Sequence, residues 1–139
     1  MNLKQFLTHP VFEIVSICAA KTGTPVYVIG GWVRDLLLHR ECKDIDIVCE
    51  GDGIALAKAV AKKLGNAYHV HVFKNFGTAQ IKFDDYDLEF VGARKESYQS
   101  HSRKPEVEKG SVADDQQRRD FTVNALAIAL NAENYGELI

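Results

Sequence analysis

The sequence predicts an α/β domain in which helices flank a mixed central sheet. In the first half of the chain, segments with helical spacing of apolar residues alternate with short apolar runs typical of buried strands. From Tyr68 onward the apolar period changes to two, which is the spacing of half-buried strands. With 139 residues and a hydrophobic content of 46%, the chain is long enough for one domain that buries roughly two-thirds of its unfolded surface.

The elements of the first half carry recognisable start and stop signals. They are predicted, in order, as a helix over residues 11–20, a strand over 26–29, a short helix reaching Leu38, a strand over 45–49 and a helix ending at Leu64. Pro10 precedes the first helix, and its fixed φ suits a first helical position. Asp52 predicts the N-cap of the last of these helices, and Gly65 is its stop signal.

A β-hairpin is predicted around the two-residue turn Asp84-Asp85. A turn at this place pairs Phe83 with Tyr86, Ile81 with Leu88, and Ala79 with Phe90 on the core side of the hairpin. The other face then carries the polar side chains of Gln80, Lys82, Asp87 and Glu89. Periodicity alone favours an ordinary solvent-facing surface for these four.

The last third of the chain carries weaker patterns. Residues 97–117 have little periodicity and many polar side chains, so they are predicted to form a loop about twenty residues long, a length that is often functional. We expect this loop to be mobile because it lacks a repeating apolar face. Residues 121–131 predict a helix, on which Asp120 and Asn124 share a face at positions i and i+4.

Composition and charge exclude several classes of protein. No apolar run approaches the roughly 20 residues that span a bilayer, and the N-terminus has no signal-peptide hydrophobic region, so no membrane partner is expected. The cysteines Cys18, Cys42 and Cys49 are an odd number without metal-ligand spacing, which indicates reduced thiols and a cytoplasmic location. The net charge of −2 argues against tight RNA binding by this segment alone, because RNA-binding surfaces are usually basic.

The most informative stretch joins Gly30-Gly31-Trp32-Val33-Arg34-Asp35 to Asp44-Ile45-Asp46-Ile47. Two glycines let a backbone turn approach a phosphate closely at the start of a helix. On a strand, the alternation places Asp44 and Asp46 on one face and the isoleucines in the core. Two carboxylates beside a phosphate cradle are typical of a divalent-metal site for a nucleoside triphosphate. An ordinary strand-turn-helix with a surface acid pair is the alternative interpretation.

The two motifs carry a family resemblance. Gly30-Gly31, a short spacer and Asp44-Ile45-Asp46-Ile47 resemble the signature of the polymerase-beta-like nucleotidyltransferases. The downstream stretch Arg118-Arg119-Asp120-Phe121-Thr122, with Asn124-Ala125, narrows the resemblance to class II tRNA nucleotidyltransferases (CCA-adding enzymes) and bacterial poly(A) polymerases, which extend RNA 3′ ends. The resemblance covers residues from about 26 to 130. It implies that residues 1–139 form the head domain with a polymerase-beta-like fold, as the N-terminal part of a longer protein.

The resemblance also implies a two-metal Mg²⁺ site. Asp44 and Asp46 are its expected ligands, and a third acid completes it for the attacking hydroxyl. Asp87 and Glu89 share a strand face, so periodicity does not choose between them. The resemblance favours Glu89, because the family's acid stands five residues before an arginine, matched here by Arg94. The residues between them, Phe90-Val91-Gly92-Ala93, depart from the Thr-rich stretch common in relatives, and an exposed strand acid remains the alternative for Glu89.

The remaining site residues are expected to bind the nucleotide. Gly30 and Gly31 cradle the triphosphate, Arg34 contacts phosphate, and Asp35 braces the loop; an internal Arg–Asp brace is the alternative for this pair. The other expected nucleotide-binding residues are Arg94, Arg118, Arg119, Asp120 and Asn124. For the last four, a helix start with solvated arginines is the alternative.

The expected function is metal-dependent transfer of nucleotides from CTP and ATP to the 3′ end of RNA, with release of pyrophosphate. The expected partner is tRNA, to which CCA, CC or A is added; the sequence does not choose among these products. A poly(A) polymerase, a nucleotide-binding module without catalytic output in isolation, and a nucleotidyltransferase that modifies a protein or small molecule are the alternatives. We expect residues 1–139 alone to be poorly active, with little discrimination between CTP and ATP, because RNA contacts would lie mainly in later domains.

Overall fold

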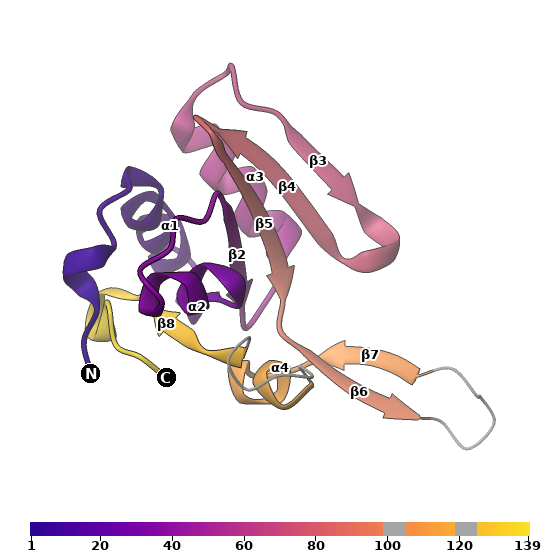
Figure 1. The fold of residues 1–139 in the computed structure, drawn as a ribbon. Coiled ribbons are helices and arrows are strands. Elements are labelled where there is room, and N and C mark those ends of the chain that lie inside the picture. Colours follow the sequence, from indigo (N-terminus) through magenta and orange to yellow (C-terminus); the bar gives the residue numbers. More distant parts are fainter. Residues whose placement is uncertain (99–104, 119–124) are drawn as a thin grey trace.

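The fold is built on a six-stranded mixed sheet with the strand order β3-β4-β5-β2-β1-β8. It was established from a computed structural model that describes residues 1–98, 105–118 and 125–139 (Figure 1). Strand β2 runs parallel to β5, and the other neighbours in the sheet are antiparallel. The strands are β1 (Val26–Ile29), β2 (Asp44–Cys49), β3 (Val70–Phe73), β4 (Thr78–Phe83), β5 (Tyr86–Gly92) and β8 (Ala127–Ala129). The predicted mixed α/β fold is therefore confirmed.

The three helices predicted in the first half of the chain are present, and their ends match the local signals. They are α1 (Pro10–Ala20), α2 (Gly31–Leu37) and α3 (Gly53–Leu64). Pro10 occupies the first turn of α1. The Asp52 carboxylate accepts hydrogen bonds from the backbone N–H groups of Ile54 and Ala55 at 3.0 and 3.1 Å, which satisfies two otherwise unpaired donors of α3. Gly65 ends α3 with a φ of 129°, a conformation that L side chains rarely adopt.

Helices α1 and α3 cover one face of the sheet. The other face carries the polar residues and a smaller apolar cluster that includes Ile29 and Val48. Figure 1 shows α3 running behind β4 and β5. The apolar side chains of the strands that point to this side pack with α1 and α3 in one core, which includes Val28, Ile45, Ile47, Ile81, Leu88, Phe90, Phe12, Val15, Leu56 and Val60. Because successive strand residues alternate, every second residue of these strands points to the opposite face.

The hairpin prediction is confirmed in its register. Strands β4 and β5 pair Phe83 with Tyr86, Ile81 with Leu88, and Ala79 with Phe90. Asp84 has a φ of 55°, as the tight turn requires. The register follows from the turn length, so the local signal at residues 84–85 sets which residues of both strands face the core.

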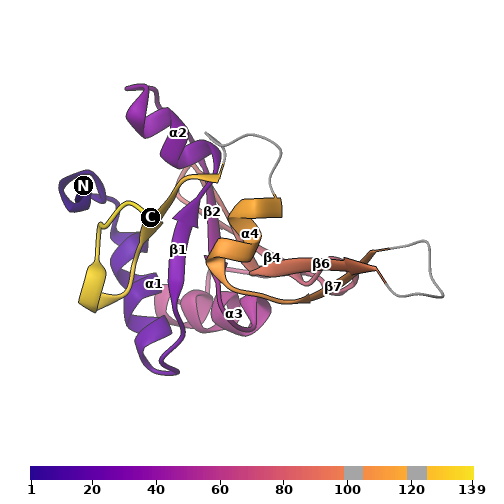
Figure 2. The same ribbon diagram turned by 90° about the horizontal axis from the view of Figure 1, so that it is seen from below.

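The prediction of a structureless loop over residues 97–117 is wrong. This region contains parts of β6 (Arg94–Tyr98) and β7 (Pro105–Lys109), which form an antiparallel two-stranded sheet, and of α4 (Val112–Arg118). Figures 1 and 2 show the β6–β7 ribbon projecting from the body of the domain. A projecting ribbon does not need the apolar alternation on which strand prediction depends. Residues 99–104 lie outside the described residues, and the mobility of this segment stays a prediction.

The prediction of a helix over residues 121–131 is also wrong where the structure describes it. Residues 121–124 lie outside the described residues, and Ala127–Ala129 form β8, which pairs antiparallel with β1. All three β8 residues are fully buried, so this short apolar run lacks the polar alternation of a half-buried strand. Short apolar runs of this kind cannot be distinguished from a buried helix by periodicity.

The two ends of the described chain meet beside β8. The backbone N–H of Leu3 donates to the carbonyl of Gly136 at 2.6 Å, and the termini lie near one another in Figure 1. Among the residues that the structure describes, no helix has the length and apolar character needed to cross a membrane.

Candidate active site

The acid pair of β2 alternates with core residues as the sequence predicts. Ile45 and Ile47 are fully buried in the core. Asp44 is exposed and Asp46 is half-buried, and both point to the opposite face of the strand. The two carboxylates therefore share the sheet face that α1 and α3 leave uncovered.

Strand β5 brings two more acids beside this pair. The parallel register of β2 and β5 aligns Asp44 with Asp87 and Asp46 with Glu89. Neighbouring strands lie about 4.8 Å apart, so the four carboxylates occupy adjacent positions on one face. Glu89 is half-buried whereas Asp87 is exposed, so Glu89 is the better enclosed of the two candidates for the third acid. The assignment of Glu89 as a metal ligand stays a prediction.

The glycine turn lies on the other side of the acid pair. Strand β1 is antiparallel to β2 and aligns its last residue, Ile29, with Asp46. Gly30 follows with a φ of 82° and a ψ of −139°, which an L side chain would not adopt without strain. Its N–H donates to the carbonyl of Leu126 at 3.2 Å, and Gly31 begins α2. The backbone of this turn is thus held next to the carboxylates, where a triphosphate would lie.

The Arg34–Asp35 pair forms the internal brace that the sequence analysis kept as an alternative. The Arg34 Nε donates to the Asp35 carboxylate at 3.1 Å, and the guanidinium holds the pKa of Asp35 below its usual range. The Arg34 side chain remains about one-third exposed at 36%, so part of it is open to solvent. A phosphate contact by Arg34 stays a prediction.

Cys42 is a neighbour of the site that sequence reasoning did not assign. Its thiol donates to the carbonyl of Asp44 at 3.3 Å. Partial burial, together with the nearby Asp35 and Asp44 carboxylates, raises the pKa of this thiol. The residue is thus a neutral hydrogen-bond donor at the start of β2, and the only sequence signal for it was its position two residues before the acid pair.

The structure describes only part of the second predicted motif. Arg118 ends α4, and Arg94 begins β6 directly after the acid-bearing strand β5. Arg119, Asp120 and Asn124 lie outside the described residues. Their roles in nucleotide binding stay predictions, and so does the shared helical face proposed for Asp120 and Asn124.

Helix α4 packs against one end of the sheet face that carries Asp44 and Asp46. Val112 packs in a second apolar cluster with Ile29, Val48 and Ala127. The N–H of Val112 donates to the Glu50 carboxylate at 2.7 Å, which ties the start of α4 to the residue after β2. Sequence patterns did not indicate this contact, because the two residues are far apart in the chain.

The donor set fits a hard divalent cation bound together with a triphosphate. Within the described ranges, no three or more His, Cys, Asp or Glu side chains are gathered as a ready metal cage. Mg²⁺ is usually held by one or two carboxylates plus substrate phosphates and water, so a cage made only of protein groups is not required. Asp44 and Asp46 supply two carboxylates of the right chemistry on one face.

A mixed sheet with paired carboxylates beside a glycine turn is the architecture of a nucleotidyltransferase head domain. The Poly A polymerase head domain family matches residues 26–139, and the chain belongs to this family. The A-adding tRNA nucleotidyltransferase of Aquifex aeolicus (strain VF5) is 49% identical over 113 residues, which are 81% of this chain and 14% of that protein. The A-adding tRNA nucleotidyltransferase of Geobacter sulfurreducens is 47% identical over 83% of this chain and 13% of its own length.

Solved structures share the fold. A tRNA-processing enzyme in an apo form is 41% identical with a TM-score of 0.80, over 94% of this chain and 31% of that one. A tRNA nucleotidyltransferase complexed with a primer tRNA and an incoming ATP analogue is 42% identical with a TM-score of 0.77, over 90% of this chain and 33% of that one. The chain therefore spans at most a third of the length of these four relatives.

Proposed function

We propose that this chain is the catalytic head of an enzyme that transfers nucleotides from nucleoside triphosphates to the 3′ end of tRNA and releases pyrophosphate. The observation that carries this proposal is the β2–β5 register, which aligns Asp46 with Glu89 beside Asp44. The glycine turn lies against the same acid pair from the β1 side. Carboxylates at adjacent positions on one sheet face, with a glycine turn next to them, are suited to nucleotidyl transfer.

Asp44, Asp46 and Glu89 would hold the magnesium ions, with the first two facing the triphosphate and Glu89 facing the RNA end. When bound, two such ions stabilise the attacking and leaving oxygens of an in-line displacement. The 3′-hydroxyl oxygen forms a bond to the α-phosphorus, the bond to the β-phosphate oxygen breaks, and the hydroxyl proton leaves to solvent or to a neighbouring base. The carboxylates position these groups, and Gly30 and Gly31 allow the phosphates to approach the backbone.

Charged side chains near the turn would complete nucleotide binding. Asp35 orients the Arg34 guanidinium through the 3.1 Å hydrogen bond, and we assign to the oriented guanidinium a contact with a phosphate oxygen. We assign further contacts with the ribose and triphosphate to Arg94, Arg118, Arg119, Asp120 and Asn124, on the strength of the family motif in the sequence.

The relatives favour AMP as the unit transferred. Three A-adding relatives are 38–49% identical, whereas two CC-adding relatives are 28% and 35% identical. Neighbouring structures hold an ATP analogue in one case and CTP in another. Poly(A) addition is the second candidate, because the family that the chain belongs to is the Poly A polymerase head domain. We place the enzyme in the cytoplasm, in keeping with the free thiols of Cys18, Cys42 and Cys49.

The decisive test is Asp46→Ala, assayed with labelled ATP, CTP and GTP separately on tRNA that lacks either its terminal A or its whole CCA end. We expect loss of at least about a hundredfold in turnover, because removal of a metal-binding carboxylate leaves the developing charge unbalanced. Asp85→Asn is the matched control, since Asp85 is an exposed acid in the β4–β5 turn. Asp46→Ala turnover within about tenfold of wild type would contradict the metal assignment.

The binding-only alternative gives a different pattern in the same experiment. A module without catalytic output would bind ATP in an Asp46-dependent manner but extend no RNA. Labelling of a protein or small molecule in place of tRNA would indicate a nucleotidyltransferase that modifies such targets. The same assay on residues 1–139 and on a longer protein that contains them tests the expectation that the head alone is poorly active and discriminates little between CTP and ATP.

A further inference from the structure

The uncovered sheet face continues well beyond the acids. A cross-strand row runs from Asp46 through Glu89 and Gln80 to His71. These residues lie on β2, β5, β4 and β3, which are neighbours in that order in the sheet. A second row joins Asp44, Asp87 and Lys82. Gln80, Lys82 and His71 are all exposed, while their inward-facing neighbours Ala79 and Ile81 are buried in the core. The polar surface on β3 and β4 is therefore continuous with the candidate active site.

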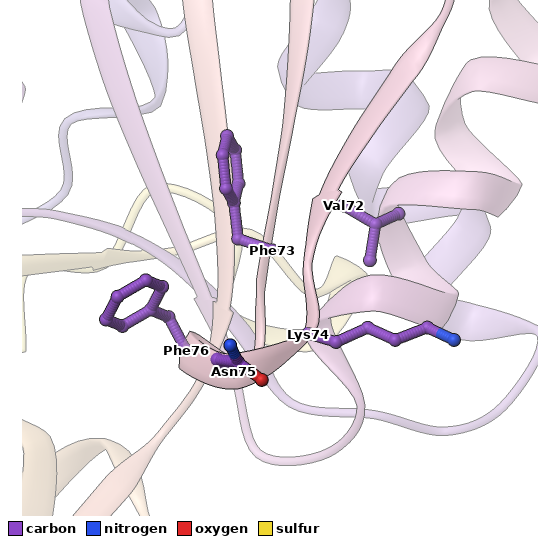
Figure 3. A pocket seen from close by; sticks show the side chains of 5 residues that line it. All are labelled: Val72, Phe73, Lys74, Asn75 and Phe76. Atoms are coloured by element: carbon purple, nitrogen blue, oxygen red, sulfur yellow. The ribbon is translucent and has the colours of Figure 1, made fainter.

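Aromatic side chains border this surface at its far edge. Phe73 ends β3 with 43% exposure, and Phe76, in the 3-10 helix η2 (Lys74–Phe76), is 68% exposed. Figure 3 shows both rings on one side of the β3–η2 segment, with Val72 and Lys74 extending to the other side. These residues line a hollow of about 400 Å³, which is in the size range of small-molecule sites. Exposed aromatic rings together with basic side chains, here Lys74 and Lys82, are the usual components of a surface that binds single-stranded nucleic acid.

The geometry of the reaction selects the side on which the RNA must lie. In an in-line displacement, the attacking hydroxyl and the leaving pyrophosphate are on opposite sides of the α-phosphorus. The glycine turn that receives the triphosphate follows β1, on one side of β2, and Glu89 on β5 lies on the other side. The RNA 3′-hydroxyl then approaches from the β5 side, and the strand behind it extends over β4 and β3.

We propose that the open face of β3 and β4, formed by His71, Phe73, Phe76, Gln80 and Lys82, is the docking surface for the last nucleotides of the RNA that is extended. This inference rests on the function proposed above. Lys82 would neutralise a backbone phosphate, Gln80 and His71 would form hydrogen bonds with phosphate or ribose, and the two phenylalanines would stack on bases. Three strand spacings separate Asp46 from His71, about 14 Å, which matches the length of a few stacked nucleotides.

Charge arrangement supports RNA over an acidic protein segment as the occupant. The acids Asp87 and Glu89 lie at the catalytic end of the surface, and the cationic Lys82 lies on the next strand away from it. An RNA strand brings its reactive hydroxyl to the acids, where metal ions would offset the charge, and a backbone phosphate to Lys82 on β4. An acidic peptide would bring its carboxylates to a surface that already carries Asp87 and Glu89, and it would bring no bases to stack on the aromatic rings.

Binding measurements on the longer protein that contains residues 1–139 test this surface. The probe is a fluorescent RNA minihelix with a single-stranded 3′ end terminating in CC, with Mg²⁺ and a non-hydrolysable ATP analogue present. We expect Phe73→Ala to weaken RNA binding about tenfold through lost stacking, and Phe73→Trp to retain it. We expect Lys82→Ala to weaken binding and to lower the slope of log affinity against log salt by about 1. ATP affinity should stay unchanged in all three variants.

Two controls match these variants in chemistry and exposure. Phe6→Ala removes a ring that is 42% exposed on the 3-10 helix η1 (Lys4–Phe6), and Lys62→Ala removes an exposed lysine of α3, which covers the opposite face of the sheet. Neither should change RNA affinity or its salt dependence. In a parallel measurement, 4-thiouridine placed near the RNA 3′ end should crosslink to a peptide within residues 70–83.

The outcomes separate this inference from the function on which it rests. If Asp46→Ala abolishes nucleotide transfer to tRNA but Phe73→Ala and Lys82→Ala bind RNA as the wild type does, the docking surface is wrong and the proposed function stands. Crosslinks confined to other peptides, or no RNA binding and no crosslink at all, would also overturn the docking surface. If Asp46→Ala transfers nucleotides to tRNA as the wild type does, the proposed function itself fails.

Discussion

Gly92→Ala tests whether the close approach of β5 to the start of α3 supports the acid-bearing face. A Cβ at position 92 would lie 2.5 Å from the Gly51 carbonyl oxygen, and a Cβ at Gly53 would lie 2.7 Å from the Val91 carbonyl carbon. These neighbours are backbone atoms, so relief requires β5 and the α3 N-terminus to separate. Because Gly92 is three residues after Glu89 on the same strand, the displacement would also move the predicted third acid.

The size of the effect follows from forced overpacking. We expect Gly92→Ala to lower the free energy of unfolding by about 1–3 kcal/mol. For 139 residues the entropy of unfolding is about 0.29 kcal/mol/K, so Tm should fall by roughly 3–10 °C. Urea denaturation and differential scanning calorimetry would measure the change.

Gly51→Ala is the matched control. Its Cβ would lie 3.2 Å from the Thr24 Cγ2, an atom of a side chain that can shift by a few tenths of an ångström. Replacement of glycine by alanine in an unstrained position changes stability by only about 0.4–1 kcal/mol, usually favourably, through the unfolded chain. A Gly92→Ala variant as stable as Gly51→Ala would refute the reasoning.

Three further predictions concern caps and titrating groups. Asp52→Ala should lower the free energy of unfolding by about 1 kcal/mol, measured by urea denaturation, because α3 loses a cap that accepts hydrogen bonds from two N–H groups. Asp52→Asn should lower it less, and equal losses would contradict the capping role. The Arg34 guanidinium lowers the pKa of Asp35, so the ionised Asp35 stabilises the fold above about pH 4, and this stabilisation is lost as the pH falls through the lowered pKa. Asp35→Asn should therefore make Tm fall less steeply at acid pH, and an unchanged dependence of Tm on pH would contradict this reasoning. Burial raises the pKa of Cys49 to about 11, so Cys49 in the native protein should react with a thiol reagent at pH 8 far more slowly than the partly exposed Cys42. Mass spectrometry of the labelled peptides would measure both rates, and equal rates would contradict the prediction.

Local chemistry in the sequence was sufficient for several elements. The Asp52 cap and the Gly65 stop act within one helix end, and the Asp84-Asp85 turn sets the β4–β5 register through residues adjacent in the chain. The alternation of Asp44 and Asp46 with isoleucines is likewise a property of one strand. Each of these signals depends on neighbours within a few residues, so it survives without knowledge of the rest of the fold.

Tertiary structure decided which strands lie together and which side chains the site contains. The alignment of Asp46 with Glu89 depends on a parallel pairing between strands separated by α3, β3 and β4, and no local pattern encodes that register. The strand β8 exists because its three buried residues complete the edge of the sheet beside β1, although their spacing also suits a helix. The sequence by itself determined the acids, the glycine turn and the hairpin, because these depend on short-range sterics and hydrogen bonds. Their assembly into one face depended on non-local pairing, because backbone hydrogen bonds between distant strands do not depend on side-chain identity.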